Sequence, residues 1–268
     1  MKKIILSLLI IAMTAAVLTG CAPSISSGLE SKWHDYEKYT YDVIKDNVSA
    51  GTLTLESFRL RKEELSIGGK TYPDMTGTKV KYELQMNNDD KVAAEVFFTV
   101  NFLPKYSYKE IVKSGAKDVI SAEYTPKKYK YTLTIDGAAS PEEEITLGKA
   151  TFYDNEMVYY VLRSSDFSTK NYSFSFNCPS PMEDRLQSRT AVVASSESIV
   201  PDALNTAVHC YEVAMSANQE IKGSTYRLYY AKSPVTINET NVMSPLVKFI
   251  EGEYVYILKS IEVTEKFK

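Results

Sequence analysis

The stretch TLTLESFRLRKEELSIGGKTYPD, residues 52–74, is written a second time as TLTIDGAASPEEEITLGKATFYD, residues 132–154. The two stretches align without a gap, and eight of their 23 positions are identical. The similarity continues downstream in the same order, where VKYEL at 80–84 aligns with VYYVL at 158–162. Because chance similarity rarely keeps its order over such a length, the pattern indicates two copies of one structural module.

A third copy of the module is fainter. The segment FYDNEMVY at 152–159 resembles FIEGEYVY at 249–256. Upstream of it, SPVTI at 233–237 stands where SPEEEITL stands in the second copy. Since any two β-hairpins could share this pattern, the C-terminal region is predicted as a further β module on weaker grounds than the first two.

The repeated module has the pattern of β-strands. In the segment 129–135, Tyr, Leu and Ile alternate with Lys and Thr, and the segment 80–86 alternates in the same way. A period of two places one face of a strand in the core and the other in solvent. Turn signals punctuate these runs at Gly68-Gly69, Asn87–Asp90, Asp154-Asn155 and Glu251-Gly252. The sequence therefore predicts a mainly β fold, built of tandem small immunoglobulin-like β-sandwich modules with one or two short helices.

Two helices are predicted between and after the modules. Ser107 and Glu110 have capping-box spacing, and Gly115 is a plausible C-terminal stop. Asp202 could cap a second helix, although VHCYEVAM at 208–215 is also compatible with a strand. The predicted plan is module 1 at 32–104, a helical connector at 105–118, module 2 at 119–180, a linker at 181–201, and a possible module 3 with a helix at 202–268.

The N-terminus carries a targeting pattern. Lys2 and Lys3 precede an apolar run, and Leu18-Thr19-Gly20-Cys21 follows it. This tetrapeptide resembles the lipobox of bacterial lipoproteins. The resemblance implies that residues 1–20 are a signal peptide, that Cys21 is lipidated, and that 21–31 is a tether to the membrane. An ordinary secretory signal peptide cut nearby is the alternative.

Composition limits the partners and the redox chemistry. The chain has 31 basic residues, two of them in the signal, which leaves 29 against 34 acidic residues and no basic stripe for nucleic acid. Cys178 and Cys210 could form a disulfide in an oxidising compartment, or could remain two buried thiols. With only two histidines far apart, no metal site or cofactor is predicted.

The search for catalytic residues yields no complete set. The Ser-x-x-Lys spacing at 114–117 lacks the companion motifs of penicillin-binding enzymes. The Glu pairs at 63–64 and 143–144 recur in both copies, as solvated turns would. Trp33, Tyr36 and Tyr39 lie directly after the tether, where aromatic side chains could form a binding surface.

We therefore expect an extracytoplasmic lipoprotein, held on a cell membrane or outer membrane by its lipid. The tether, the repeats and the missing catalytic set favour a non-enzymatic binding or structural surface module. Its expected partner is an envelope or extracellular protein or glycan. The alternative is an envelope hydrolase with an acidic site in 181–220, the large unmatched segment that carries Glu183, Asp184, Asp202 and His209.

Overall fold

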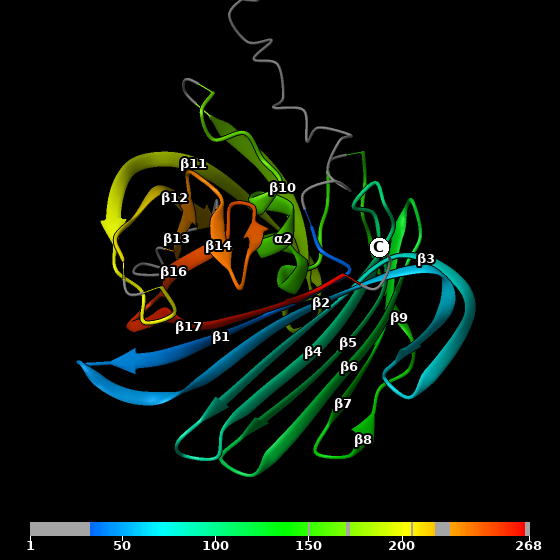
Figure 1. Ribbon diagram of the computed structural model, residues 1–268. Helices are drawn as coiled ribbons and strands as arrows, with labels where there is room; N and C mark the ends of the chain where they lie inside the picture. Colours follow the sequence, from blue (N-terminus) through cyan, green and yellow to red (C-terminus); the bar gives the residue numbers. More distant parts are fainter. Residues whose placement is uncertain (1–32, 150, 170–171, 205, 218–225, 266–268) are drawn as a thin grey trace, which may run out of the picture.

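The computed structural model describes residues 33–149, 151–169, 172–204, 206–217 and 226–265. They form one antiparallel sheet of 15 strands, a separate two-stranded hairpin and one short α-helix (Figure 1). The helix is α2 (Val158–Arg163), which follows the 3-10 turn η2 (Asn155–Met157). The hairpin is β14 (Val235–Ile237) with β15 (Thr240–Val242). The mainly β prediction is confirmed.

The sheet has two halves joined at β1. The first half contains β1 (Tyr36–Lys45), β2 (Val48–Ile67), β3 (Lys70–Met86), β4 (Lys91–Phe98), β5 (Pro104–Lys113), β6 (Ala116–Tyr124), β7 (Lys128–Ile135), β8 (Ala138–Ala139) and β9 (Glu143–Thr146). The second half contains β10 (Ser173–Ser180), β11 (Arg185–Ile199), β12 (Val208–Ala217), β13 (Tyr226–Ala231), β16 (Leu246–Glu251) and β17 (Tyr254–Thr264). Because β1 pairs with both β2 and β17, the two halves form one continuous sheet.

The sheet curls until its two ends meet (Figure 1). The Tyr153 N–H donates to the Asn177 carbonyl at 2.9 Å, and the Asn177 N–H donates to the Thr151 carbonyl at 2.8 Å. The Tyr131 hydroxyl of β7 donates to Asp184, in the β10–β11 turn, at 3.1 Å. These contacts bring the β7–β9 end of the strand order against β10, and the curled sheet encloses a core.

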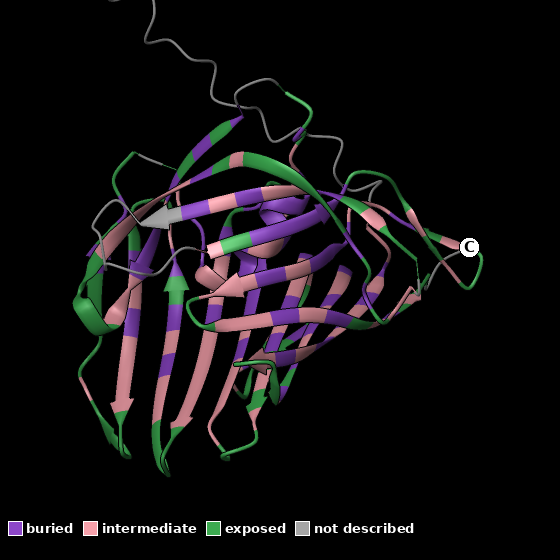
Figure 2. Ribbon diagram, turned by 90° about the vertical axis from the view of Figure 1, so that its left-hand side faces the viewer, coloured by how far each residue is buried: buried purple, intermediate pink, exposed green. Residues whose placement is uncertain are grey.

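The core lies inside the curled sheet and contains α2 (Figure 2). Alternation along β1 places Tyr39, Tyr41 and Val43 on its inner face. They share one buried cluster with Val161 and Leu162 of α2. Burying an aliphatic or aromatic side chain of this size contributes roughly 1.5–3 kcal/mol, so this cluster is the main stabilising unit.

The predicted turns at glycines are confirmed. Gly68 and Gly69 have φ of 55° and 76° and connect β2 to β3. A Cβ on Gly68 would lie 2.5 Å from the ring of Tyr108, so the hairpin needs glycine for space as well as for its backbone angle. Gly252, with a φ of 59°, turns β16 into β17, and there glycine is favoured by its backbone angle alone.

The helical connector predicted at 105–118 is wrong. This segment forms β5 and the start of β6, joined by a turn at Ser114 and Gly115. Strand β5 pairs with β4 on one side and with β6 on the other, and these ladders bond its backbone N–H and carbonyl groups. A capping box stabilises only the first turn of a helix. The many hydrogen bonds of the two ladders stabilise the strand by more than the capping box would stabilise a helix.

The linker predicted at 181–201 and the helix predicted after Asp202 are also wrong. The linker becomes η3 (Pro181–Glu183) and β11, which pairs with β10 and β12. The segment 208–217 is β12, the strand alternative that the sequence left open. Val213 and Met215 of β12 both lie in the main core cluster, because residues two apart on a strand share one face.

Tandem immunoglobulin-like modules are not what the described residues form. The second copy of the repeat diverges where VKYEL is strand β3 but VYYVL is helix α2. The Asp154 side chain caps η2 by accepting from the Glu156 N–H, and five of the six α2 residues are buried. The sequence similarity of 152–159 to 249–256 does not extend to structure either. The first segment leads through η2 into α2, whereas the second forms the β16–β17 hairpin.

Candidate binding pocket at Trp33

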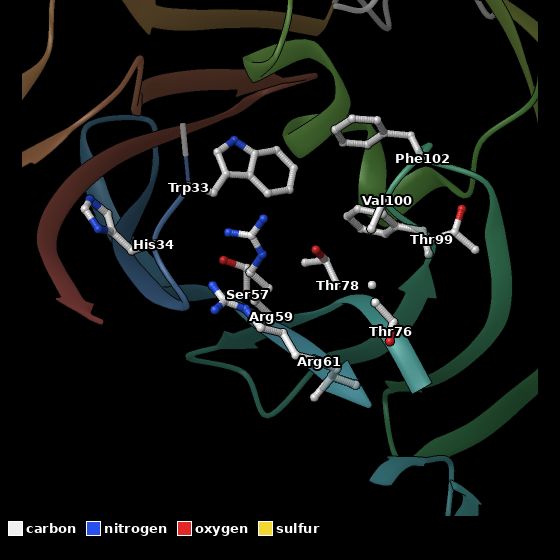
Figure 3. Close-up of a pocket in the computed structure, with 13 residues that line it drawn as sticks. Trp33, His34, Ser57, Arg59, Arg61, Thr76, Thr78, Thr99, Val100 and Phe102 are labelled. Carbon is white, nitrogen blue, oxygen red and sulfur yellow. The ribbon is translucent and has the colours of Figure 1, made fainter. Parts of the chain in front are cut away.

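A cavity of about 470 Å³ lies beside Trp33, and we call it the Trp33 pocket (Figure 3). Its volume falls in the range of small-molecule sites. Residues from four segments build it. They are Trp33 and His34 before β1, Ser57, Arg59, Leu60 and Arg61 of β2, Thr76, Gly77 and Thr78 of β3, and Phe98, Thr99, Val100 and Phe102 at the end of β4 and after it.

One wall of the Trp33 pocket is aromatic. The Trp33 ring meets Phe102 edge-on, with 5.5 Å between ring centroids, and meets Tyr160 of α2 at the same distance. Phe98 and Phe102 stack with centroids 5.6 Å apart. Within the described chain the buried indole N–H of Trp33 has no hydrogen-bond partner, which leaves one unmet donor beside the pocket.

The facing wall is cationic and rich in hydroxyl groups (Figure 3). Arg59 and Arg61 are two residues apart on β2, so they share one face of the strand. Arg61 donates to the buried carboxylate of Asp35 at 2.8 Å, and the backbone N–H of Arg59 donates to the Asp35 carbonyl. Among the described residues that line the pocket, Arg59 and Arg61 are basic and none is acidic, so the lining carries positive charge.

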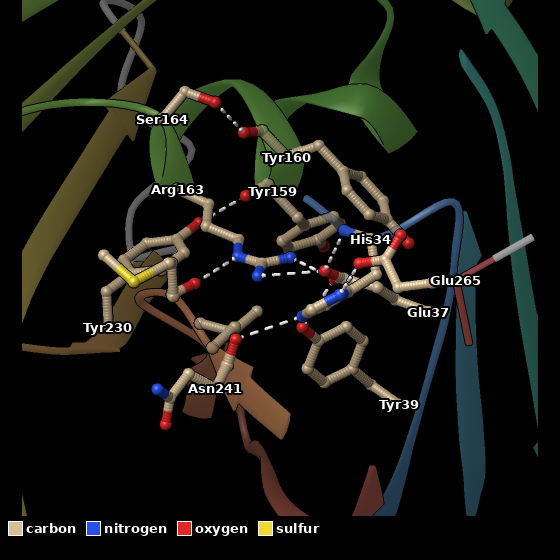
Figure 4. Close-up of polar contacts among 12 residues, drawn as sticks. His34, Glu37, Tyr39, Tyr159, Tyr160, Arg163, Ser164, Tyr230, Asn241 and Glu265 are labelled. Atoms are coloured by element: carbon tan, nitrogen blue, oxygen red, sulfur yellow. Dashed lines mark hydrogen bonds and ion pairs between the residues drawn. The ribbon is translucent and has the colours of Figure 1, made fainter. Parts of the chain in front are cut away.

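A buried ion pair lies behind the aromatic wall (Figure 4). Arg163 of α2 is 4% exposed and Glu37 of β1 is fully buried. Arg163 donates through Nη2 to Glu37 Oε1 at 3.3 Å, through Nη1 to Glu37 Oε2, and through Nε to the Met243 carbonyl at 2.8 Å. Glu37 also accepts from the Tyr39 hydroxyl at 2.7 Å and from the His34 N–H at 3.0 Å. Each guanidinium nitrogen of Arg163 and each carboxylate oxygen of Glu37 therefore has at least one hydrogen-bond partner.

The ion pair fixes the segment that carries Trp33. Burial acts to raise the pKa of Glu37, but the charge and hydrogen bonds of Arg163 outweigh it and hold that pKa below its ordinary value. The Arg163 guanidinium also lies 5.9 Å from the Trp33 ring centroid. Both nitrogens of His34 are engaged, Nδ1 with Glu265 and Nε2 with the Asn241 carbonyl.

The structure separates the three aromatic residues predicted as a surface. Trp33 lines the pocket, but Tyr39 is buried at 3% exposure and bonds Glu37. Tyr36 faces the other side of β1, where it packs on Phe58 with centroids 5.1 Å apart. The predicted surface is therefore wrong except for Trp33, because successive residues of a strand point to opposite faces.

Cys178 and Cys210 are both buried free thiols. Cys178 lies opposite Gln187 and Cys210 lies opposite Glu197, ten residues farther along β11. At about 3.3 Å per residue this separates them by roughly 30 Å. A disulfide needs Cα atoms within about 7 Å, so the structure has the two-thiol alternative. Cys21 lies outside the described residues, and its lipidation stays a prediction.

The acidic site predicted in 181–220 does not come together. Glu183 accepts from Arg185 at 2.6 Å, and Asp184 accepts from Tyr131. His209 bonds Ser198 at the far end of β11, roughly 40 Å away by strand length. Among the described residues, no group of three or more His, Cys, Asp or Glu is placed to hold a metal ion.

Sequence reasoning missed the residues that build the site. Arg59 and Arg61 stand in the quoted repeat, yet the second copy has Ala139 and Pro141 there. That difference marked the first copy as special. Glu37 shares its strand face with Tyr39 and Tyr41, and a carboxylate on an apolar face requires a buried partner. Its partner Arg163 comes from 126 residues away, which no local pattern indicates.

The fold belongs to the class of strongly curved, mainly antiparallel β proteins with one short helix. It is similar to a beta-barrel-like protein from Brucella abortus with a domain of unknown function, DUF1849. The TM-score is 0.50, over 87% of this chain and 99% of that one, at 12% sequence identity. No protein-family model and no curated protein matches the sequence. In the described part of the chain, no helix combines the length and the apolar character needed to cross a membrane.

Proposed function

We propose that this chain is a lipid-anchored extracytoplasmic binding protein, and that its Trp33 pocket holds a small organic anion with a flat apolar part. One observation carries the proposal: two arginines face an aromatic wall across a single cavity. Guanidinium groups bind carboxylate and phosphate through paired hydrogen bonds. Phe98, Phe102 and Trp33 offer apolar surface to the rest of the ligand.

The lipobox and the tether support the proposed location. Trp33 lies two residues after the end of the predicted tether and 12 positions after Cys21. A fully extended chain of that length spans about 40 Å. A lipid on Cys21 would therefore hold the pocket close to the membrane surface. Binding is favoured over catalysis because both nitrogens of His34, the base nearest the pocket, are already engaged.

The test uses the single tryptophan of the chain as its reporter. The protein from residue 22 onward is titrated with benzoate, phenyl phosphate and uncharged benzyl alcohol while Trp33 fluorescence is followed. We expect a saturable, salt-sensitive change with at least one anion and none with the alcohol. The two anions distinguish a carboxylate site from a phosphate site.

Two variants locate the site. Arg59→Met should weaken anion binding by about tenfold or more, as loss of a charged hydrogen bond predicts. Arg227→Met is the matched control, because Arg227 is half exposed, pairs with Glu212 and does not line the pocket. An equal response to benzyl alcohol, or binding that Arg59→Met leaves unchanged, would contradict the proposal.

A further inference from the structure

A second cavity, of about 600 Å³, lies away from the Trp33 pocket and shares no lining residue with it. Residues of β3, β4 and β5 form one side of it, η2 and α2 form the middle, and β11, β12, β13, β16 and β17 form the other side. We call it the tyrosine groove, after its five lining tyrosines, Tyr82, Tyr159, Tyr226, Tyr254 and Tyr256. The exposed turn at Gly252 and Glu253 lies at its rim, so it is reachable from solvent.

The groove holds a buried acceptor and a buried donor that the described residues leave unmet. The acceptor is Asn155 Oδ1 and the donor is Arg189 Nε. Buried polar atoms are satisfied in the great majority of cases, so two unmet atoms in residues that line one cavity indicate missing partners. A ligand that satisfies both must donate one hydrogen bond and accept another. A hydroxyl group does both.

The other charges of the groove balance each other. Lys109 and Glu156 form an ion pair, with side chains 28% and 12% exposed. Arg189 and Glu251 line the same cavity, and Glu253 at its rim accepts from Lys45 at 2.6 Å. Burial raises the pKa of Glu251, although the Tyr226 hydroxyl, Lys109 and Arg189 oppose this effect. Unlike the Trp33 pocket, the groove carries no excess of positive charge, and an uncharged ligand fits it best.

Aromatic rings supply the remaining surface. Tyr82 and Tyr159 lie nearly parallel, at 17° and 6.4 Å between centroids. Tyr256 is held against Phe249 at 4.0 Å, which fixes its ring. Rigid aromatic faces pack against the C–H face of a sugar ring, while polar groups at the edge bind its hydroxyls.

We propose that the tyrosine groove is a second binding site, which takes a neutral sugar of one or two rings through Asn155, Arg189 and the tyrosine faces. The sugar ring stacks on the partly exposed rings of Tyr226 and Tyr254, because Tyr82 and Tyr256 are buried. One sugar hydroxyl donates to Asn155 Oδ1, and a sugar oxygen accepts from Arg189 Nε.

Saturation-transfer NMR on the full chain in a non-sugar detergent tests this inference, with glucose, N-acetylglucosamine, maltose and cellobiose as probes. We expect transfer to the ring protons of at least one sugar. Asn155→Ala and Arg189→Met should each weaken binding by about tenfold. Asn88→Ala, in the exposed β3–β4 turn, is the matched control and should bind as the wild type does.

Three results decide the inference. Absence of transfer from the folded wild type to every probe would overturn it and leave water as the partner of both atoms. Sugar binding that persists in both groove variants would overturn it as well. Thermal melting checks that each variant is folded, and a variant that does not fold is replaced by Tyr254→Ala at the rim. Binding that Trp33→Phe leaves intact separates this site from the anion pocket, so either proposal can fail alone.

Discussion

Two ion pairs lie inside the curled sheet, and they are satisfied to different degrees. Arg163 and Glu37 bond each other, and the Met243 carbonyl, the Tyr39 hydroxyl and the His34 N–H take up further positions. Lys109 and Glu156 also bond each other, but Asn155 and Arg189 line the same cavity with atoms that lack partners among the described residues. We call the first pair closed, because each nitrogen and oxygen of its two charged groups has a described partner. We call the second incomplete, because two unmet atoms belong to residues that line its cavity, whereas the unmet Trp33 N–H and Tyr160 hydroxyl near the first pair belong to the aromatic wall.

This difference indicates that the first pair has a structural role, whereas the second cluster could bind a ligand. A fully satisfied buried pair specifies one arrangement and binds nothing else, so Arg163 and Glu37 position the Trp33 segment. An incomplete cluster retains hydrogen-bonding capacity that a ligand can use. If this distinction holds, the two pairs should differ in stability, in pH dependence and in tolerance to substitution.

The largest effect on the free energy of unfolding is expected from breaking the Arg163–Glu37 ion pair. Arg163→Met leaves the Glu37 carboxylate buried without its counter-charge, which costs about 3–5 kcal/mol in the free energy of unfolding. Urea denaturation measures it. The double variant Glu37→Leu with Arg163→Met removes both charges and should recover at least half of the loss. A loss below about 1 kcal/mol for the single variant would show that the pair is not closed.

Breaking the Lys109–Glu156 ion pair should lower the free energy of unfolding by a smaller amount. Lys109→Met leaves Glu156 unpaired, but both side chains retain some exposure, so water reaches them. We expect a loss of about 2 kcal/mol by the same denaturation. A loss as large as that of Arg163→Met would remove the contrast between the two pairs.

The incomplete cluster should also respond to pH. Burial and the neighbouring Glu156 carboxylate raise the pKa of Asp154 to about 8. A raised pKa means that the folded state binds the proton more tightly than the unfolded state. The stabilisation from this proton is therefore full in acid below pH 4 and is lost as pH rises through about 8.

Asp154→Asn should remove this component, because the amide stays neutral at every pH. The difference in unfolding free energy between wild type and variant should change by more than about 1.4 kcal/mol between pH 4 and pH 8, in the direction of a wild type weakened at high pH. Asp89→Asn, in the exposed β3–β4 turn, makes the same chemical change away from the cluster and serves as the control. A constant difference between Asp154→Asn and wild type would show that Asp154 is ionised throughout.

The smallest effect is expected at the unmet acceptor. Asn155→Ala removes an oxygen that bonds no described group, so the unliganded protein should change in stability by less than about 0.5 kcal/mol. Thermal and urea unfolding without added sugar measure it. A loss above about 1.5 kcal/mol in the free energy of unfolding would show that Asn155 Oδ1 has a hydrogen-bond partner within the protein. The second cluster would then be satisfied like the first.

Local patterns predicted the strands better than the helices. The alternation at 129–135 became β7, and the glycine turns at 68–69 and 252 became hairpins. The capping box at 107–110 became a strand, while the true helix start at Asp154 was taken for a hairpin turn. Asp154, Glu156 in the first turn and Arg163 in the last turn were helix signals in the sequence.

The sequence by itself determined the β character and the glycine turns at 68–69 and 252, because alternation and glycine angles are local properties, and it predicts the lipid anchor from a short motif. Only the tertiary structure decided how far the sheet continues, which copy of the repeat became a helix, and which charges meet inside. The β1–β17 ladder joins residues about 220 positions apart, and Arg163 finds Glu37 across 126 positions. Both sites depend on such long-range contacts, since burial and pairing are properties of the folded chain.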